Sequence, residues 1–355
     1  MTNTGTDIRI VVDAMGGDFA PASVVQGALD ALRERADGFS LVLVGDEERV
    51  RGELAKVDAA KSGTAGGNDI TQGGRLSVVH APEVIDMSDA PTAAVKSKKD
   101  SSIAVGLRMQ REGKAEAFVS AGNTGAVLSA STLILGRLAH VGRPTIGALI
   151  PTAKGPCLLV DAGANVDCKP RHLFEFGVMG AIYTGAMLGI PAPAVGLLNI
   201  GEEDSKGNEA VREAHRLLAG SSLCFKGNVE GRDVLKGDVQ VIVCDGFTGN
   251  ILLKFGESIP AFFKARFAAL ASRSLLSTAV ALIARKSLRS IMKELDYQEH
   301  GGVPVLGVDG VTIIGHGRST PKAIKNMIFR AQEMAARGVH RQIEESLARF
   351  RAGDE

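Results

Sequence analysis

Short apolar runs that end at an acidic or small polar residue, with glycine close behind, recur along this chain. Residues 8–12 form such a run before Asp13, and others end at Ser120, Asp161 and Asp245. Apolar runs without polar alternation are typical of parallel strands that are buried on both faces. Open α/β sheets bind their ligands outside the carboxyl ends of such strands. We therefore expect an α/β fold with a mostly parallel sheet, in which these polar strand ends converge on one edge and form a site.

The length of the chain allows one large α/β domain or two smaller ones, and we expect a single catalytic domain over residues 1–355. Residues 145–150 and 157–160 are two apolar runs separated by a short turn, which predicts a hairpin in or beside the parallel sheet. Residues 170–188 predict a helix whose glycines allow tight packing against another backbone. Residues 57–75, rich in glycine and poor in apolar side chains, predict a flexible surface loop.

The segment after Ser120 has the pattern of a strand, a turn and a helix. Gly122 opens the turn, Asn123 and Thr124 follow it, and apolar residues with helical spacing continue over residues 126–138. A helix N-terminus presents unpaired backbone N–H groups that favour an anion. The glycine spacing matches neither a dinucleotide fingerprint nor a Walker loop. Two interpretations are equally open, an anion site and an ordinary connection capped by Asn123 or Thr124.

Cationic side chains near such turns are candidates for binding an anion. Lys96, Lys98 and Lys99 fan out around a helix that precedes the Gly122 turn, although a solvated helix surface explains such a run equally well. Near the C-terminus, His316 stands between two glycines at a strand end, where either a ligand contact or a turn role is possible on these residues alone. Arg318 beside it is a candidate partner for phosphate.

Residues 258–293 differ in composition from the rest of the chain. They contain seven basic residues and no acidic one, interleaved with phenylalanine and leucine, and a serine-rich break at residues 272–277 divides them. The pattern predicts a protruding amphipathic helical hairpin that binds an anionic membrane surface or an acidic protein. A hairpin packed on the core with solvated basic faces is the alternative. The residues expected to form the binding surface are Phe263, Lys264, Arg266, Arg273, Leu275, Leu276, Arg285 and Lys286.

Composition excludes several classes of function. The net charge of +1 and the scarcity of aromatic residues argue against a nucleic-acid partner. The four cysteines lie far apart without metal-ligand spacing, and no apolar run reaches the ~20 residues needed to cross a bilayer. No Gly-x-Ser-x-Gly elbow marks an activated serine. We expect a cytoplasmic protein that uses neither a metal nor a cofactor.

Taken together, the loops resemble those of the bacterial phosphate acyltransferases, which make acyl phosphate from acyl-[acyl carrier protein] for phospholipid synthesis. The segments that carry the resemblance run through nearly the whole chain, namely residues 12–18, 98–102, 120–125, 159–169, 198–208, 245–250 and 315–319. One departure is the glycine-rich stretch at residues 62–74, which is longer than the family's usual connection and lies away from these motifs.

The resemblance implies an α/β/α sandwich of the isocitrate dehydrogenase and phosphotransacetylase type, and a homodimer. It implies that inorganic phosphate attacks the thioester of a fatty acyl carrier protein, and that the acyl phosphate passes to a membrane glycerol-3-phosphate acyltransferase. It also implies peripheral association with the inner face of the membrane. These properties are expectations at this point.

The resemblance also suggests roles for residues in the matching loops. Asn123 and Thr124 are expected to donate to the oxyanion, and His316 to protonate the leaving thiolate. The residues expected to be catalytic are Asn123, Thr124, Asp161 and His316. Those expected to bind phosphate or substrate are Asp13, Gly16, Gly17, Lys98, Lys99, Ser120, Gly122, Asn165, Lys169, Asp245, Asn250 and Arg318.

Three other functions fit parts of the pattern. A phosphotransacetylase for short acyl-CoA would use similar loops. A nucleotide-linked dehydrogenase of the same fold is disfavoured, because the first strand turn lacks Gly-x-Gly-x-x-Gly. A non-enzymatic scaffold on a lipid surface would explain the basic segment but would leave the polar strand ends without a purpose.

Overall fold

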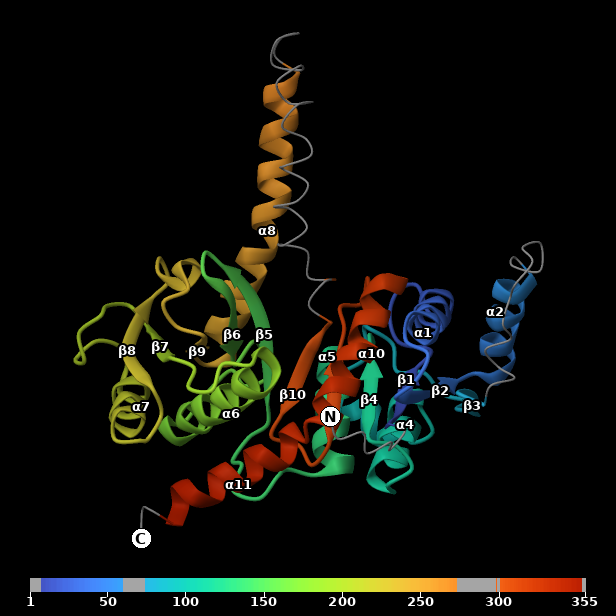
Figure 1. Ribbon diagram of the computed structural model, residues 1–355, viewed down its shortest axis with the longest axis horizontal. Helices are drawn as coiled ribbons and strands as arrows, with labels where there is room; N and C mark the ends of the chain where they lie inside the picture. The colour runs from blue at the N-terminus through green and yellow to red at the C-terminus, as the bar shows by residue number, and fades with distance from the viewer. Residues whose placement is uncertain (1–7, 60–73, 273–297, 299–300, 353–355) are drawn as a thin grey trace.

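Eleven strands form one continuous sheet in the computed structural model of the chain (Figure 1). The structure describes residues 8–59, 74–272, 298 and 301–352. The strand order across the sheet is β3-β2-β1-β4-β11-β10-β5-β6-β9-β7-β8. The strands are β1 (Ile8–Asp13), β2 (Phe39–Gly45), β3 (Leu76–His80), β4 (Ala117–Ser120), β5 (Thr145–Thr152), β6 (Gly155–Val160), β7 (Val195–Asn199), β8 (Phe225–Glu230), β9 (Val241–Val243), β10 (Val303–Leu306) and β11 (Val311–Ile314).

The direction of the strands changes in the middle of the sheet. β10 is antiparallel to both β11 and β5, and β5 is antiparallel to β6, so the hairpin predicted at residues 145–160 is confirmed. The other pairings are parallel. Three antiparallel pairings reverse the chain direction, so β1, β4 and β11 end at one edge of the sheet, whereas β6 and β9 end at the other. The expectation that Asp13, Ser120, Asp161 and Asp245 converge on one edge is therefore wrong.

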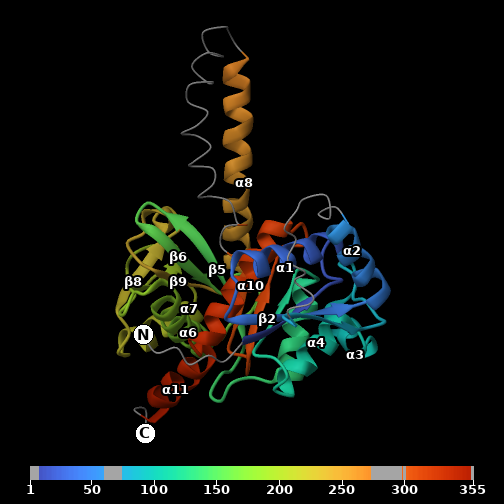
Figure 2. The same ribbon diagram turned by 45° about the vertical axis from the view of Figure 1, so that its right-hand side comes forward.

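Helices cover both faces of the sheet and complete the α/β/α sandwich that was expected (Figures 1 and 2). Alternate strand residues face opposite sides, so Val12 and Val119 pack in one core while Val11 and Phe118 pack in the other. The first core also contains residues of α1 (Ala22–Glu34), α2 (Glu47–Ala59), α6 (Pro170–Leu188), α7 (Glu209–Ala219), α10 (Pro321–Ala336) and α11 (Val339–Ala352). The second also contains residues of α3 (Pro91–Ser97), α4 (Ser102–Arg111), α5 (Thr124–Ala130) and the π-helix η1 (Ser131–Leu135), and Leu253 of α8 (Gly246–Ala271) packs against it. A 3₁₀ turn, η2 (Val234–Lys236), precedes β9.

Several predicted elements can be compared directly with these bounds. The helix over residues 170–188 is confirmed as α6. The helix predicted over residues 126–138 is shorter, because it widens into η1 and stops at Gly136, whose φ of 92° lies outside the helical region. Most of the loop predicted at residues 57–75 lies outside the described residues, and the single domain over residues 1–355 stays a prediction.

Helix α8 projects from the body of the protein (Figures 1 and 2). It begins at Gly246, where the Asp245 carboxylate accepts the backbone N–H of Thr248, and it continues through Pro260. The expected start of a helical segment at residue 258 is therefore wrong. Every residue from 261 to 270 is exposed, which agrees with the projection. The second half of the expected hairpin lies outside the described residues, and no described helix is long and apolar enough to span a membrane.

Gly106 allows α4 to pack directly on the sheet, and this contact can be tested by substitution. A Cβ at Gly106 would lie 2.4 Å from Phe118 Cε2, and the Phe118 side chain is fully buried. We expect Gly106→Ala to lower the free energy of unfolding by about 1–3 kcal/mol, because the helix must move away from the sheet. In α2, a Cβ at Gly52 would meet open space, so Gly52→Ala should raise this free energy by up to about 1 kcal/mol. Urea unfolding of both variants is the measurement, and equal effects would contradict the close packing.

Candidate active site

The ends of β1, β4 and β11 lie side by side at one edge of the sheet, and hydrogen bonds join the turns that follow them. The Gly315 N–H donates to the Ser120 carbonyl at 2.8 Å, and the Asp18 N–H donates to the Gly317 carbonyl at 2.7 Å. We call these three turns, residues 13–19, 120–125 and 315–319, the strand-end cluster. Its parts come from widely separated stretches of sequence and are held together by backbone contacts.

Asp13 and Ser120 form the buried base of the strand-end cluster. The Ser120 hydroxyl donates to Asp13 Oδ2 at 2.6 Å and accepts the Gly122 N–H at 3.0 Å. The Met15 N–H donates to Asp13 Oδ1 at 3.0 Å. Burial raises the pKa of the Asp13 carboxyl, and the hydrogen bond from Ser120 opposes this rise. Both side chains are buried, so they shape the turns from beneath and do not present a surface to a ligand.

Gly16 is required by the close approach of the first two turns. A Cβ at this position would lie 2.5 Å from Asp13 Oδ2 and 2.7 Å from the Gly122 nitrogen. Gly17 has a φ of 100° and carries the chain past the Gly317 carbonyl, which would lie 2.9 Å from a Cβ there. The glycines predicted to bind substrate therefore have a clear structural role, because they bring three backbones together.

Four side chains of the strand-end cluster are exposed and polar, and one of them, Asp18, belongs to the turn after β1. Thr124 is the first residue of α5, and His316 and Arg318 follow β11. His316 Nδ1 accepts the Arg318 N–H at 3.1 Å, so a neutral imidazole carries its proton on Nε2. Within the described residues, the Arg318 guanidinium has no hydrogen bond or ion pair. The exposed side of the cluster thus offers a hydroxyl, an imidazole, a guanidinium and the Asp18 carboxylate.

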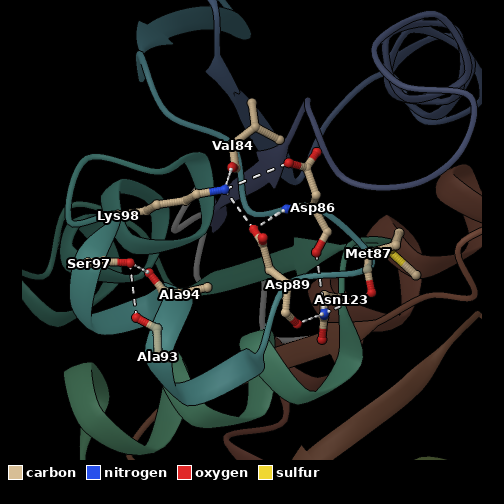
Figure 3. A network of polar contacts seen from close by, with 9 residues as sticks. All are labelled: Val84, Asp86, Met87, Asp89, Ala93, Ala94, Ser97, Lys98 and Asn123. Atoms are coloured by element: carbon tan, nitrogen blue, oxygen red, sulfur yellow. Dashed lines mark hydrogen bonds and ion pairs between the residues drawn. The ribbon is translucent and has the colours of Figure 1, made fainter.

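Asn123 caps α5 and anchors a neighbouring segment (Figure 3). Its Oδ1 accepts the Ala126 N–H at 3.1 Å. Its Nδ2 donates to the carbonyls of Asp86, Met87 and Asp89 at 3.1–3.3 Å. Both ends of the amide are occupied, so in this structure Asn123 has no donor left for an oxyanion, contrary to expectation. The alternative interpretation of Asn123 as the cap of this turn is confirmed.

Lys98 is also bound within the protein (Figure 3). Helix α3 ends at Ser97, so Lys98 and Lys99 follow the helix and do not lie on its surface as expected. Lys98 Nζ lies 2.6 Å from Asp89 Oδ2 and donates to the Val84 carbonyl at 2.8 Å. The pair raises the pKa of Lys98 and lowers the pKa of Asp89. The charge of Lys98 is therefore compensated by Asp89 and is poorly placed to bind phosphate, whereas Lys99 is exposed.

Asp161 organises a second loop, at the opposite edge of the sheet. Its Oδ1 accepts the N–H groups of Ile146, Gly163 and Ala164 at 3.0–3.3 Å. Its Oδ2 accepts the Asn165 N–H at 2.6 Å and the Asn165 side-chain amide at 2.9 Å. The carboxylate is completely buried, and these five donors satisfy it. Asp161 and Asn165 are thus structural residues in this loop, and the expected catalytic role of Asp161 has no support from its geometry.

The Asp161 loop packs against the start of α8. The Gly246 N–H donates to the Asn165 carbonyl at 2.7 Å, and a Cβ at Gly249 would lie 1.9 Å from the Asp161 carbonyl oxygen. Asn250 is exposed on the first turns of α8 beside Gly163.

The exposed Lys169 follows this loop. It lines an open depression of about 780 Å³ together with residues of α7. The expected site residues therefore form two groups, one at each edge of the sheet.

The described residues include no group of three or more His, Cys, Asp or Glu side chains placed to hold a metal ion. Sequence reasoning missed the part that Met87 and Asp89 play beside the strand-end cluster. The only signal was the Ser88-Asp89-Ala90-Pro91 stretch, which is typical of a helix start and says nothing about contacts with Asn123.

Comparisons with known proteins place this geometry in context. A family model described as "Fatty acid synthesis protein" matches residues 8–342. The chain is 46% identical to the phosphate acyltransferase of Acetivibrio thermocellus over 326 residues, and this matched region covers 92% of each chain. It is 45% identical to the phosphate acyltransferase of Pelotomaculum thermopropionicum over 341 residues, and this matched region covers 96% of this chain and 95% of the relative.

Solved structures show the same fold. A phosphotransacetylase from Streptococcus pyogenes matches with a TM-score of 0.60 at 17% identity, over 93% of this chain and 94% of that chain. The EutD phosphotransacetylase from Staphylococcus aureus matches with a TM-score of 0.57 at 15% identity, over 93% and 95%. These likenesses confirm the expected sandwich of the phosphotransacetylase type.

The buried carboxyl of Asp13 predicts a pH dependence of stability. Its pKa is raised above the ordinary 3.8, so the folded protein binds this proton more tightly than the unfolded chain does. The contribution of Asp13 to the free energy of unfolding is therefore complete below about pH 4 and is lost as the pH rises through the folded pKa. We expect Asp13→Asn to gain stability relative to the unmodified protein as the pH increases from about 4 to about 8.

Urea unfolding of both proteins across this pH range measures the effect. Asp37→Asn, at an exposed position, is the control for the change of charge. A difference between Asp13→Asn and the unmodified protein that stays constant with pH would contradict the raised pKa.

Proposed function

We propose that this chain transfers the acyl group of an acyl carrier thioester to inorganic phosphate. The premise is its family, because the chain belongs to the phosphate acyltransferases of the fatty acid synthesis protein family. Acyl transfer to phosphate is the activity of the family, and the protein is an enzyme of that kind. The acyl carrier protein as donor, the homodimer and delivery of the product to a membrane glycerol-3-phosphate acyltransferase are parts of the proposal.

We place the reaction at the strand-end cluster. The observation that carries this choice is the turn after β11, which is bonded to the turns after β1 and β4 and presents the exposed His316 and Arg318. Among the residues that the structure describes, the Arg318 guanidinium has no partner. At neutral pH a large fraction of inorganic phosphate is the dianion, and a guanidinium can bind it with two parallel hydrogen bonds. The Asp161 loop is the weaker candidate, because its carboxylate is fully occupied by its own loop.

In this reaction the residues must bind phosphate, stabilise the oxyanion and stabilise the leaving sulfur. A phosphate oxygen attacks the thioester carbonyl, and the carbon–sulfur bond then breaks to give acyl phosphate and the carrier thiolate, which takes up a proton. Arg318 holds the phosphate, and Thr124 with the backbone of its turn donates to the oxyanion that forms on the carbonyl. His316, whose Nε2 carries the proton when the imidazole is neutral, donates a hydrogen bond to the leaving sulfur, and the proton that the thiolate takes up comes from water. The dianion needs no general base.

Helix α8 provides a surface suited to two further partners, an anionic membrane and the acyl carrier protein. Phe262, Phe263 and Phe267 are 38–62% exposed, and Lys264 and Arg266 lie between them. Apolar and basic side chains on one projecting helix suit an anionic bilayer surface, and basic side chains also attract an acidic carrier protein. We propose that α8 attaches the enzyme to the cytoplasmic face of the membrane, where its product is used. The expected surface residues Arg273, Leu275, Leu276, Arg285 and Lys286 lie outside the described part of the chain.

The function is tested by following free thiol after mixing the protein, phosphate and either palmitoyl-carrier protein or acetyl-CoA. We expect thiol release that depends on phosphate with the palmitoyl donor. Release with acetyl-CoA alone would instead support a short-chain phosphotransacetylase, and release with neither donor would refute both transferase functions.

Arg318 should determine the affinity for phosphate. We expect Arg318→Met to raise the KM for phosphate by about 10- to 100-fold, since it removes hydrogen bonds between charged groups. Arg318→Lys should recover part of this loss, because it restores the charge without the two parallel donors. Steady-state kinetics at varied phosphate measure the change, and Arg33→Met on α1, where Arg33 pairs with Asp30, is the control. An unchanged KM in Arg318→Met would exclude Arg318 as the phosphate ligand.

Phe263 tests the membrane surface. We expect Phe263→Glu to weaken binding to vesicles that contain anionic lipid by at least about tenfold, because it removes apolar contact and adds repulsion. Leu133→Glu changes a comparably exposed leucine in η1, away from α8, and should bind as the unmodified protein does. Vesicle sedimentation measures the bound fraction, and equal binding by all three proteins would show that α8 does not contact the membrane.

A further inference from the structure

Met87 is a large apolar side chain left exposed beside the polar strand-end cluster. Its side chain is 48% exposed. A Cβ built on Gly317 would lie 2.9 Å from Met87 Cε and 3.4 Å from Asp18 Oδ1, so Met87 lies against the turn that carries His316 and Arg318. Phe19, the residue after Asp18, is also 48% exposed. The polar groups assigned to the reaction therefore have an apolar neighbour.

The segment that carries Met87 has little regular structure of its own, yet it is bonded from two sides (Figure 3). Asn123 donates to its carbonyls on one side, as described above. On the other side, Lys98 binds the Asp89 carboxylate at 2.6 Å, and the same Asp89 Oδ2 accepts the Asp86 N–H at 2.9 Å. We call Asn123, Asp89 and Lys98 the clamp. The clamp holds the backbone on both sides of Met87, and its contacts to the Asp89 carboxylate are charge-assisted hydrogen bonds, which are stronger than neutral ones.

A ligand that covers the exposed Met87 side chain would remove its apolar surface from water, and the firmly held segment would keep the side chain in place for that contact. The proposed substrate supplies such a ligand, because its acyl chain is apolar from the first carbon after the carbonyl that phosphate attacks. A phosphate held by Arg318 places that carbonyl close to the turn after β11, and the chain then leaves across the neighbouring surface. Methionine suits this contact, since its flexible thioether adapts to chains of differing shape.

We propose that Met87 contacts the acyl chain next to the thioester and that the clamp positions Met87 for this contact. The proposal rests on the proposed function and adds a residue that selects for long acyl groups. It also gives Lys98 and Asn123 a role in the reaction that does not require either to touch phosphate. They are positioning residues that act through the segment bearing Met87.

The test compares acetyl- and palmitoyl-carrier protein, which share a carrier and differ only in the chain. We expect Met87→Ser to lower kcat/KM for the palmitoyl donor by about tenfold, with little change for the acetyl donor and in the KM for phosphate. Met87→Leu should retain most of the preference. Leu217→Ser, at an exposed leucine of α7 on the other face of the sheet, is the matched control and should change neither value.

The clamp is tested with the same two donors. Lys98→Met should reproduce the selective loss of Met87→Ser, and Lys98→Arg should restore the preference because it renews the pair with Asp89. Urea unfolding shows whether each variant is folded at the assay temperature.

Two outcomes would overturn the proposal. An equal loss for both donors in Met87→Ser would mean that Met87 contacts the carrier or merely supports the turn, and no loss would mean that the chain takes another path. A wild-type protein that releases no thiol with any donor would refute the proposed function itself, which is a distinct result.

Discussion

The parallel alignment of β1, β4 and β11 is the constraint on which the candidate site depends. Because the three strands end together, their turns meet, and backbone hydrogen bonds from Gly315 and Asp18 join them. The turns approach so closely that Gly16 has no room for a side chain. Polar groups from three distant parts of the sequence thereby share one small surface, which is what binding a small anion beside a thioester requires.

Buried polar side chains support this surface from below and from the side. Asp13 and Asn123 fall in turns of this cluster that sequence reasoning assigned to chemistry, and both are occupied by partners within the protein. The same holds for Asp161 in the loop at the opposite edge. Such groups are costly to bury unless they are paired, so they make the turns rigid and leave the reacting roles to exposed neighbours. In the proposed mechanism the reacting roles accordingly fall to Thr124, His316 and Arg318, which are exposed on the same cluster.

Much of the fold could be predicted from the sequence, because apolar runs and glycine turns mark strands and helices locally. The hairpin within the sheet and α6 followed from such patterns. The relative direction of the two halves of the sheet could not be predicted, since periodicity does not determine which strands pair. The ion pair of Lys98 with Asp89 could not be predicted either. Helix α3 lies between the two residues in the sequence, and they meet only because the chain after α3 returns to the segment before it. By contrast, an aspartate followed by Ala-Gly-Ala-Asn is a recognisable turn former, so the structural role of Asp161 could have been inferred.

The location of phosphate at the strand-end cluster is the central claim, and calorimetric titration with phosphate tests it most directly. Gly16→Ala would force the first two turns apart, whereas Asn250→Ala alters the exposed side of the loop at the opposite edge. We expect phosphate binding to be lost in Gly16→Ala and retained in Asn250→Ala. Binding retained in Gly16→Ala and lost in Asn250→Ala would place phosphate at the opposite edge and contradict the claim.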